Sequence, residues 1–230
     1  MANDASAMNA KSIEALTGAV LARLPDRFAR TSRGQWELPR SDISWRVTVD
    51  RDENWSSGQG RVWVGVLVPQ VYGILPDLMP IRTSKGDIAY NLLKLAGGRG
   101  TEWRSRFGVT PKPRTWSLSQ FLDGERQVTS EEYEALLADL LAKVAMPWFS
   151  RFNSSYDVGN VLISERKSLE AAHAVGYPLE IAASILWLRG DRDTARAILR
   201  MDATEKRPPE KRRAVERLRE DLLRRLDDSK

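Results

Sequence analysis

The first regular pattern in the chain is an apolar position at every third or fourth residue. The residues that form it are Ile13, Leu16, Val20 and Leu24. This spacing puts all four on one face of a helix, so it predicts an amphipathic helix over residues 11–24 that ends at Pro25. Residues 1–10 are small and polar, and we expect them to be disordered.

After this helix the pattern changes to the alternation of β-strands. Residues 28–31 and 35–38 flank a Ser-Arg-Gly turn, and apolar and polar residues alternate from 43 to 49. The run 61–68 is apolar on both faces, as in an inner strand. Together these segments predict an antiparallel meander of about four strands.

The segment 69–128 is rich in proline, which excludes long elements, and we expect only a short helix over 87–95. Its part 99–116 interleaves basic and aromatic side chains. The candidate partner-binding residues there are Trp103, Arg104, Arg106, Phe107, Arg114 and Trp116. Such a segment suits single-stranded nucleic acid, through base stacking and phosphate contacts, or an acidic protein surface. A buried Trp pair with solvated arginines is the plainer interpretation.

From residue 130 the spacing is helical again. Thr129 and Glu132 form a capping-box pattern at the start of a helix that we expect Pro147 to break. An aromatic cluster follows, made of Trp148, Phe149 and Phe152. Further helices are expected over 154–163, 165–175, 178–189, 191–202 and 209–227. The turn Gly190-Asp191 predicts a tight helical hairpin near 178–202 that resembles a single tetratricopeptide-type unit.

The last helix combines an apolar stripe with many charges. The stripe consists of Val215, Leu218, Leu222 and Leu226. Pairs of opposite charge four residues apart, such as Asp221 and Arg225, indicate a salt-bridged amphipathic helix and not a nucleic-acid-binding arm. Such a helix can dock on its own fold or dimerise. The whole pattern predicts an α+β fold: a disordered terminus over 1–10, an antiparallel β-meander packed with helices over 11–163, and a C-terminal helical subdomain over 164–230.

Composition narrows the function. The chain has no Cys and a single His, so it cannot build a Cys nucleophile, a thiolate metal site or a paired-His zinc site by itself. We expect no catalytic residue, cofactor or metal, although a hydrolase that uses carboxylates alone stays open. No apolar run is long enough to span a membrane, and the lack of Cys suits a reducing cytoplasm. The net charge of +5 suits an acidic partner or nucleic acid.

Three weaker patterns have plainer explanations. His173 lies among small apolar residues near a predicted helix end, as packing histidines do. Asp50, Asp52 and Asn54 match the first ligands of a calcium loop, but Trp55 and Arg61 occupy positions where that loop requires Gly and Glu. The glycines of 97–100 lack the Lys-Ser/Thr of a phosphate-binding loop, so a helix end is the better interpretation.

The chain also resembles a family of uncharacterised, mainly bacterial proteins. The resemblance is carried by the strand Val62–Pro69, the helix Glu131–Ala145 and the aromatic segment Met146–Phe152, and it covers about residues 11–163. It implies no activity and no catalytic residues. We therefore expect a cytoplasmic, non-enzymatic protein-binding module, with immunity to a toxin or bacterial conflict as its concrete form. The alternative is a nucleic-acid-binding accessory protein that uses 99–116.

Overall fold

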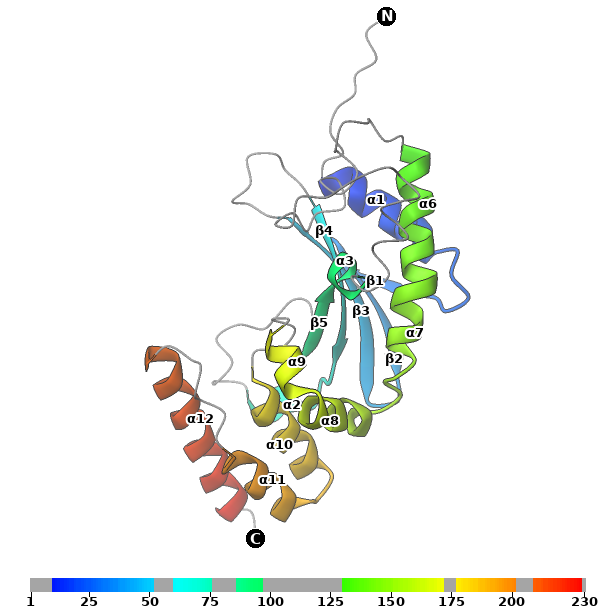
Figure 1. Ribbon diagram of the computed structural model, residues 1–230. Helices are drawn as coiled ribbons and strands as arrows, with labels where there is room; N and C mark the ends of the chain where they lie inside the picture. Colours follow the sequence, from blue (N-terminus) through cyan, green and yellow to red (C-terminus); the bar gives the residue numbers. More distant parts are fainter. Residues whose placement is uncertain are drawn as a thin grey trace, which may run out of the picture. The chain divides into compact units, whose positions relative to one another are not determined.

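The computed structural model describes residues 10–51, 60–75, 86–96, 130–171, 177–201 and 209–228. The chain forms two compact units. Unit 1 comprises 1–39, 45–65 and 89–151, and unit 2 comprises 40–44, 66–88 and 152–230. A five-stranded antiparallel sheet combined with helices confirms the α+β class (Figure 1). The predicted domain bounds at 10 and 163 stay predictions.

The sheet follows the chain, in the order β1-β2-β3-β4-β5. Its strands are β1 (Ala29–Ser32), β2 (Gln35–Arg40), β3 (Ile43–Arg51), β4 (Gly60–Leu67) and β5 (Ile88–Asn91). The first four confirm the predicted meander and its hairpin turn. The fifth corrects the expected helix over 87–95, because only α3 (Leu92–Leu95) is helical there. A four-residue strand has too little periodicity to be recognised, and pairing with its neighbour in the sheet decides its conformation.

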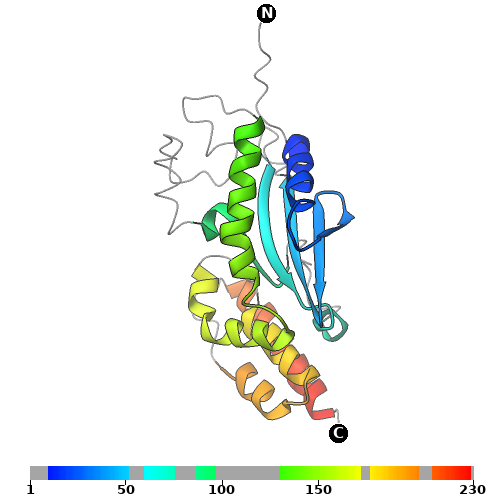
Figure 2. The same cartoon turned by 90° about the vertical axis from the view of Figure 1, so that its right-hand side faces the viewer.

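Helix α1 (Ala10–Leu21) packs against α6 (Ser130–Leu140) in unit 1 (Figures 1 and 2). A methyl group added at Gly18 of α1 would lie 3.2 Å from the Trp36 ring, so glycine lets the helix approach β2 closely. The core of unit 1 includes residues at most 2% exposed: Ile13, Val20, Leu21, Val47, Val64, Tyr133, Leu136, Leu137, Leu140 and Phe149.

Pro147 does not break the helix, contrary to the sequence prediction. After α6 the backbone widens into a π-helical turn, η1 (Leu141–Ala145), and continues as α7 (Met146–Phe149). The amide of Met146 donates to the carbonyl of Leu141, five residues earlier. Proline lacks an amide hydrogen and its ring crowds the preceding turn, so a wider turn before it lets the helix continue.

The predicted aromatic cluster is confirmed for Trp148 and Phe149, at the end of this helix. Phe149 stacks on Trp45 of β3 with ring centroids 5.1 Å apart and 11° between the planes. Phe28 approaches Phe149 at 5.9 Å, and Trp148 meets the edge of Tyr90 at 5.8 Å. Ring pairs at these distances stabilise a core by more than the hydrophobic contribution of the area that they bury.

Unit 2 is mostly helical. Its helices are α2 (Val71–Ile74), α8 (Ser155–Ser164), α9 (Arg166–Ala171), α10 (Pro178–Leu188), α11 (Arg192–Leu199) and α12 (Pro209–Asp228). The α10–α11 hairpin is confirmed, and α10 also packs against α8. Gly190 makes the turn with φ +85°, and the Asp191 carboxylate accepts the amide of Thr194 at 3.2 Å to cap α11.

Helix α12 docks on its own unit. The predicted stripe is buried, with Val215, Leu218, Leu222 and Leu226 each at most 2% exposed. Two of its arginines also donate to carbonyls outside the helix: Arg219 to Met201 at 2.6 Å and Arg225 to Ile74 at 3.0 Å. These two basic side chains of the tail therefore serve docking. No helix among the described residues is long and apolar enough to cross a membrane.

Candidate functional site

The six candidate partner-binding residues predicted from the sequence, Trp103, Arg104, Arg106, Phe107, Arg114 and Trp116, lie outside the described residues. The same is true of His173, Asp52, Asn54 and the glycines of 97–100. Those expectations stay predictions. Within the described residues, the most distinctive polar surface lies elsewhere in unit 1.

Four exposed arginines follow one another along the segment that leads into the edge strand β1 and its turn. They are Arg23, Arg27, Arg30 and Arg33, which we call the arginine edge. All four side chains of β1 itself are exposed, and β1 is the first strand of the sheet. Arg30 and Arg33 thus place positive charge on the first strand of the sheet and on its turn, and Arg23 and Arg27 precede them along the chain.

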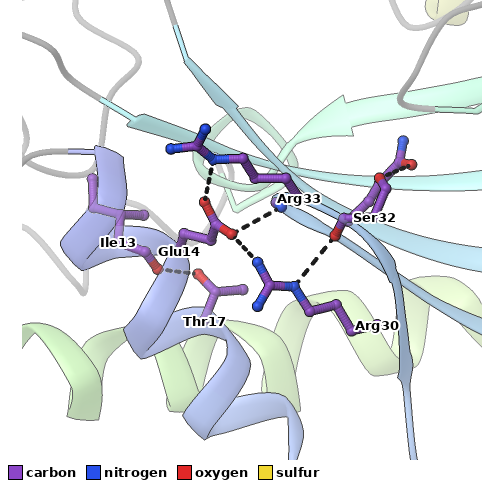
Figure 3. A network of polar contacts seen from close by, with 8 residues as sticks. Ile13, Glu14, Thr17, Arg30, Ser32 and Arg33 are labelled. Atoms are coloured by element: carbon purple, nitrogen blue, oxygen red, sulfur yellow. Dashed lines mark hydrogen bonds and ion pairs between the residues drawn. The ribbon is translucent and has the colours of Figure 1, made fainter.

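A buried carboxylate organises two of these arginines. Glu14 of α1 is only 8% exposed, and it accepts hydrogen bonds from a guanidinium nitrogen of Arg30 and from the amide of Gly34 at 3.1 Å. Nε of Arg33 lies 4.0 Å from the other carboxylate oxygen. Figure 3 shows Glu14 between the side chains of Arg30, which lies on β1, and Arg33, which lies in the hairpin turn. One carboxylate therefore binds Arg30 by a hydrogen bond and lies within ion-pair distance of Arg33.

The hairpin backbone makes this arrangement possible. Gly34 has φ +68°, and a Cβ on it would lie 2.8 Å from the carbonyl oxygen of Val49, so another residue would strain the turn. Nε of Arg30 donates to the carbonyl of Ser32 at 3.3 Å, and its guanidinium carbon lies 5.8 Å from the centre of the Trp36 ring. These contacts restrict the rotamers of Arg30 before any partner arrives.

The arginine edge retains a surplus of positive charge. Arg23 pairs with Glu134, Arg30 and Arg33 both approach Glu14, and Asp26 lies in the same segment, so three carboxylates accompany the four arginines. Arg30 and Arg33 are 57% and 71% exposed, which leaves guanidinium edges accessible to solvent. Preorganised guanidinium groups bind carboxylates and phosphates through paired N–H donors.

The arginine edge suits anion binding better than proton transfer or metal binding. Arginine stays protonated at any pH a protein tolerates, so it cannot act as a base. Within the described ranges, no group of three His, Asp or Glu side chains is placed to hold a metal ion. The plainer role of charges on an edge strand is to prevent sheet-to-sheet aggregation.

Sequence reasoning did not find this surface. Its signal was present in the arginines at 23, 27, 30 and 33, but that spacing crosses a helix end, a loop and a strand. No single period therefore joins them. In the sequence, Glu14 is only a polar residue beside the apolar stripe of α1. Its contact with Arg30 and Arg33 forms only when the hairpin packs against this helix.

Two other buried carboxylates, both in unit 2, form hydrogen bonds within the fold. Asp87 accepts from the amide of Val68 at 2.6 Å and from the hydroxyl of Tyr72 at 2.7 Å. Glu180, 1% exposed, accepts from Nε of Arg219 at 2.6 Å. Each connects segments distant in the sequence, and neither lies in a group suited to metal binding within the described residues.

Comparison with known proteins adds no assignment. Neither a family model, nor a curated protein, nor a solved structure matches this sequence. The class of surface, a preorganised cationic segment that includes the edge strand, is therefore the basis for the function proposed below.

Proposed function

We propose that this protein is a non-enzymatic binding module that recognises an acidic surface of another protein through the arginine edge. The observation that carries the proposal is the buried Glu14 carboxylate, which accepts a hydrogen bond from Arg30 and lies 4.0 Å from Nε of Arg33, while both arginines stay more than half exposed. Arginine is frequent among the residues that dominate binding energy, and fixed rotamers lower the entropy lost on binding.

Charge favours an acidic partner over a basic one. The chain carries a net +5, and four exposed arginines within one short segment would slow the approach of any other cation. Immunity to a toxin or a role in bacterial conflict is the concrete form of the proposal, with a target that presents an acidic face. We include in this proposal the resemblance to an uncharacterised, mainly bacterial family.

Nucleic acid binding is less well supported at the arginine edge. Single strands bind where exposed aromatic rings stack with bases. The two rings of this segment, Phe28 and Trp36, are only 9% and 5% exposed. The nucleic-acid alternative therefore stays tied to 99–116.

The test is a pull-down with the full chain as tagged bait, comparing wild type with the double variant Arg27→Ala plus Arg33→Ala. We expect wild type to recover an acidic protein with or without nuclease treatment, and the variant to lose it. A matched control is Arg212→Ala plus Arg213→Ala, which removes two exposed arginines from α12 and should leave recovery unchanged.

The outcomes separate the two classes of function. Nucleic acid recovered only without nuclease would overturn the proposal and favour the segment 99–116. Recovery that is equal for wild type and the Arg27/Arg33 variant would also contradict it, because the arginine edge would then serve only to protect the strand. Substituting lysine at 27 and 33 should restore part of the recovery, since lysine keeps the charge without the paired donors.

A further inference from the structure

The backbone of β1 is a second binding element within the arginine edge. Strand β1 stands at one end of the strand order and, among the described strands, pairs with β2 alone. All four of its residues are exposed. A terminal strand carries backbone N–H and C=O groups that point away from the sheet, and an extended segment of another chain can pair with them. The side chains on the two faces of β1 decide which segment fits.

The face of β1 that carries Arg30 is turned toward α1. Arg30 lies opposite Trp36 in the hairpin register, and its guanidinium carbon is 5.8 Å from the centre of that ring. Trp36 lies against α1, since a Cβ added at Gly18 would be 3.2 Å from the ring. On this side two guanidinium groups, those of Arg30 and Arg33, approach the single carboxylate of Glu14 (Figure 3). A partner carboxylate would balance the excess positive charge.

The opposite face of β1 is already balanced in charge. Glu37 follows Trp36 in β2, so its side chain points to the other face of the sheet. The Glu37 carboxylate accepts a hydrogen bond from Arg46 of β3 at 2.8 Å and one from the hydroxyl of Thr31 at 3.4 Å. The Glu37 and Arg46 side chains are mostly buried, and they neutralise each other. A partner side chain on this face therefore fits best when it is uncharged.

We propose that β1 accepts a short extended segment of the acidic partner as an added strand, with Asp or Glu at every second position toward Arg30 and Arg33, and uncharged residues between them. This inference rests on the proposed function and specifies how the partner is bound. The pairing of β1 with β2 is irregular between Arg30 and Ser32, so the added ladder is short and the carboxylates provide much of the specificity. A second copy of β1 does not fit, because it would bring further arginines to the same edge.

A peptide titration of the full chain, followed by amide chemical shifts, tests the charge pattern. The probe is a capped seven-residue peptide in which Glu alternates with Thr. We expect its binding to weaken about tenfold in Arg30→Ala or Arg33→Ala, and at least as much when Gln replaces Glu in the peptide. Arg212→Ala plus Arg213→Ala is the matched control and should bind the peptide as wild type does. No binding by wild type, or equal binding of the Gln peptide, would contradict the proposal.

Peptides methylated at alternate amides test the strand pairing itself. Alternate amides of an extended segment point to opposite edges, so methyl groups on one set block the hydrogen bonds to β1 and methyl groups on the other set do not. We expect one of the two isomers to bind about tenfold more weakly and the other to bind like the parent peptide. Backbone amides of β1 that pair with the peptide should exchange their hydrogens about tenfold more slowly in the complex.

The outcomes separate this inference from the proposed function. Equal affinity of the two methylated isomers, or unchanged hydrogen exchange in β1, would overturn strand addition even if the Arg27/Arg33 variant still loses an acidic protein in the pull-down. A pull-down that recovers no acidic protein would overturn the proposed function, whereas unequal isomers would still support strand addition at β1. Slower exchange in β1 at high protein concentration without peptide would identify a second copy as the occupant and contradict the inference.

Discussion

The hydroxyl group of Tyr133 shows how one buried polar atom affects stability. The side chain is fully buried on α6, its oxygen has no hydrogen-bond partner among the described residues, and burial raises the pKa of the phenol far above its usual value. We expect Tyr133→Phe to raise the free energy of unfolding by about 1 kcal/mol, because it removes an unsatisfied buried group without changing the ring. Urea unfolding measures the change.

Tyr72→Phe is the matched control for that substitution. The Tyr72 hydroxyl donates to Asp87 at 2.7 Å, so its loss should lower stability. If Tyr133→Phe destabilised the protein as much as Tyr72→Phe, the Tyr133 hydroxyl would have to be satisfied in solution.

Asp42 links the stability of unit 2 to pH. Partial burial alone would raise the pKa of Asp42, but hydrogen bonds from Ser155 and the nearby charge of Arg189 hold it below its usual 3.8. A lowered folded-state pKa means that the unfolded chain binds more protons in acid. The stabilisation is therefore complete above the unfolded-state value and is lost as pH falls through the folded-state value.

Ser155→Ala should move the pKa of Asp42 upward and reduce the loss of stability between neutral pH and pH values below the usual 3.8. Carboxyl chemical shifts give the pKa, and urea unfolding at each pH gives the stability. Asp42→Asn serves as the control, because it removes the titrating group. An unchanged pKa in Ser155→Ala would contradict the assigned cause.

At the scale of elements, α12 depends on one buried stripe. Leu222 is 1% exposed, while its neighbour Leu223 is only partly buried. Leu222→Ala should cost about 2–5 kcal/mol of unfolding free energy, since it removes packed methyl groups and leaves a cavity. Leu223→Ala changes the helix propensity by the same amount, and it should lower the free energy of unfolding clearly less. Equal costs would mean that α12 is not docked through this stripe.

Elements also differ in how well the sequence predicts them. The apolar stripe of α12 was sufficient to predict that helix, and the Gly-Asp turn was sufficient to predict where α11 begins. In these elements the local sequence signals agree with the final fold. Strand β5 and the continuation through Pro147 were not predicted. In both cases packing against the rest of the unit overrides a weak or contrary local preference.

At the scale of the molecule, strands β3, β4 and β5 each contribute residues to both units. One part of a strand does not lose its backbone hydrogen bonds independently of the rest. We therefore expect the protein to unfold in one cooperative transition. Among the described residues, the Trp side chains that are less than 9% exposed are Trp36, Trp45 and Trp148, and all three belong to unit 1. Their fluorescence should therefore change at the same urea concentration as the far-ultraviolet circular dichroism of the helices. Two separate midpoints would contradict the expectation.

The sequence by itself determined the α+β class, the meander from residue 28 to 68, and the helices from 130 onward, since short-range periodicity and turn residues specify these. It also limited the chemistry, because a chain without Cys and with one His has few catalytic groups. Only the tertiary structure decided that Glu14 pairs with Arg30 and Arg33, and that Arg189 lies over Tyr156. These contacts join residues that no local period relates, and they form only when distant segments pack together.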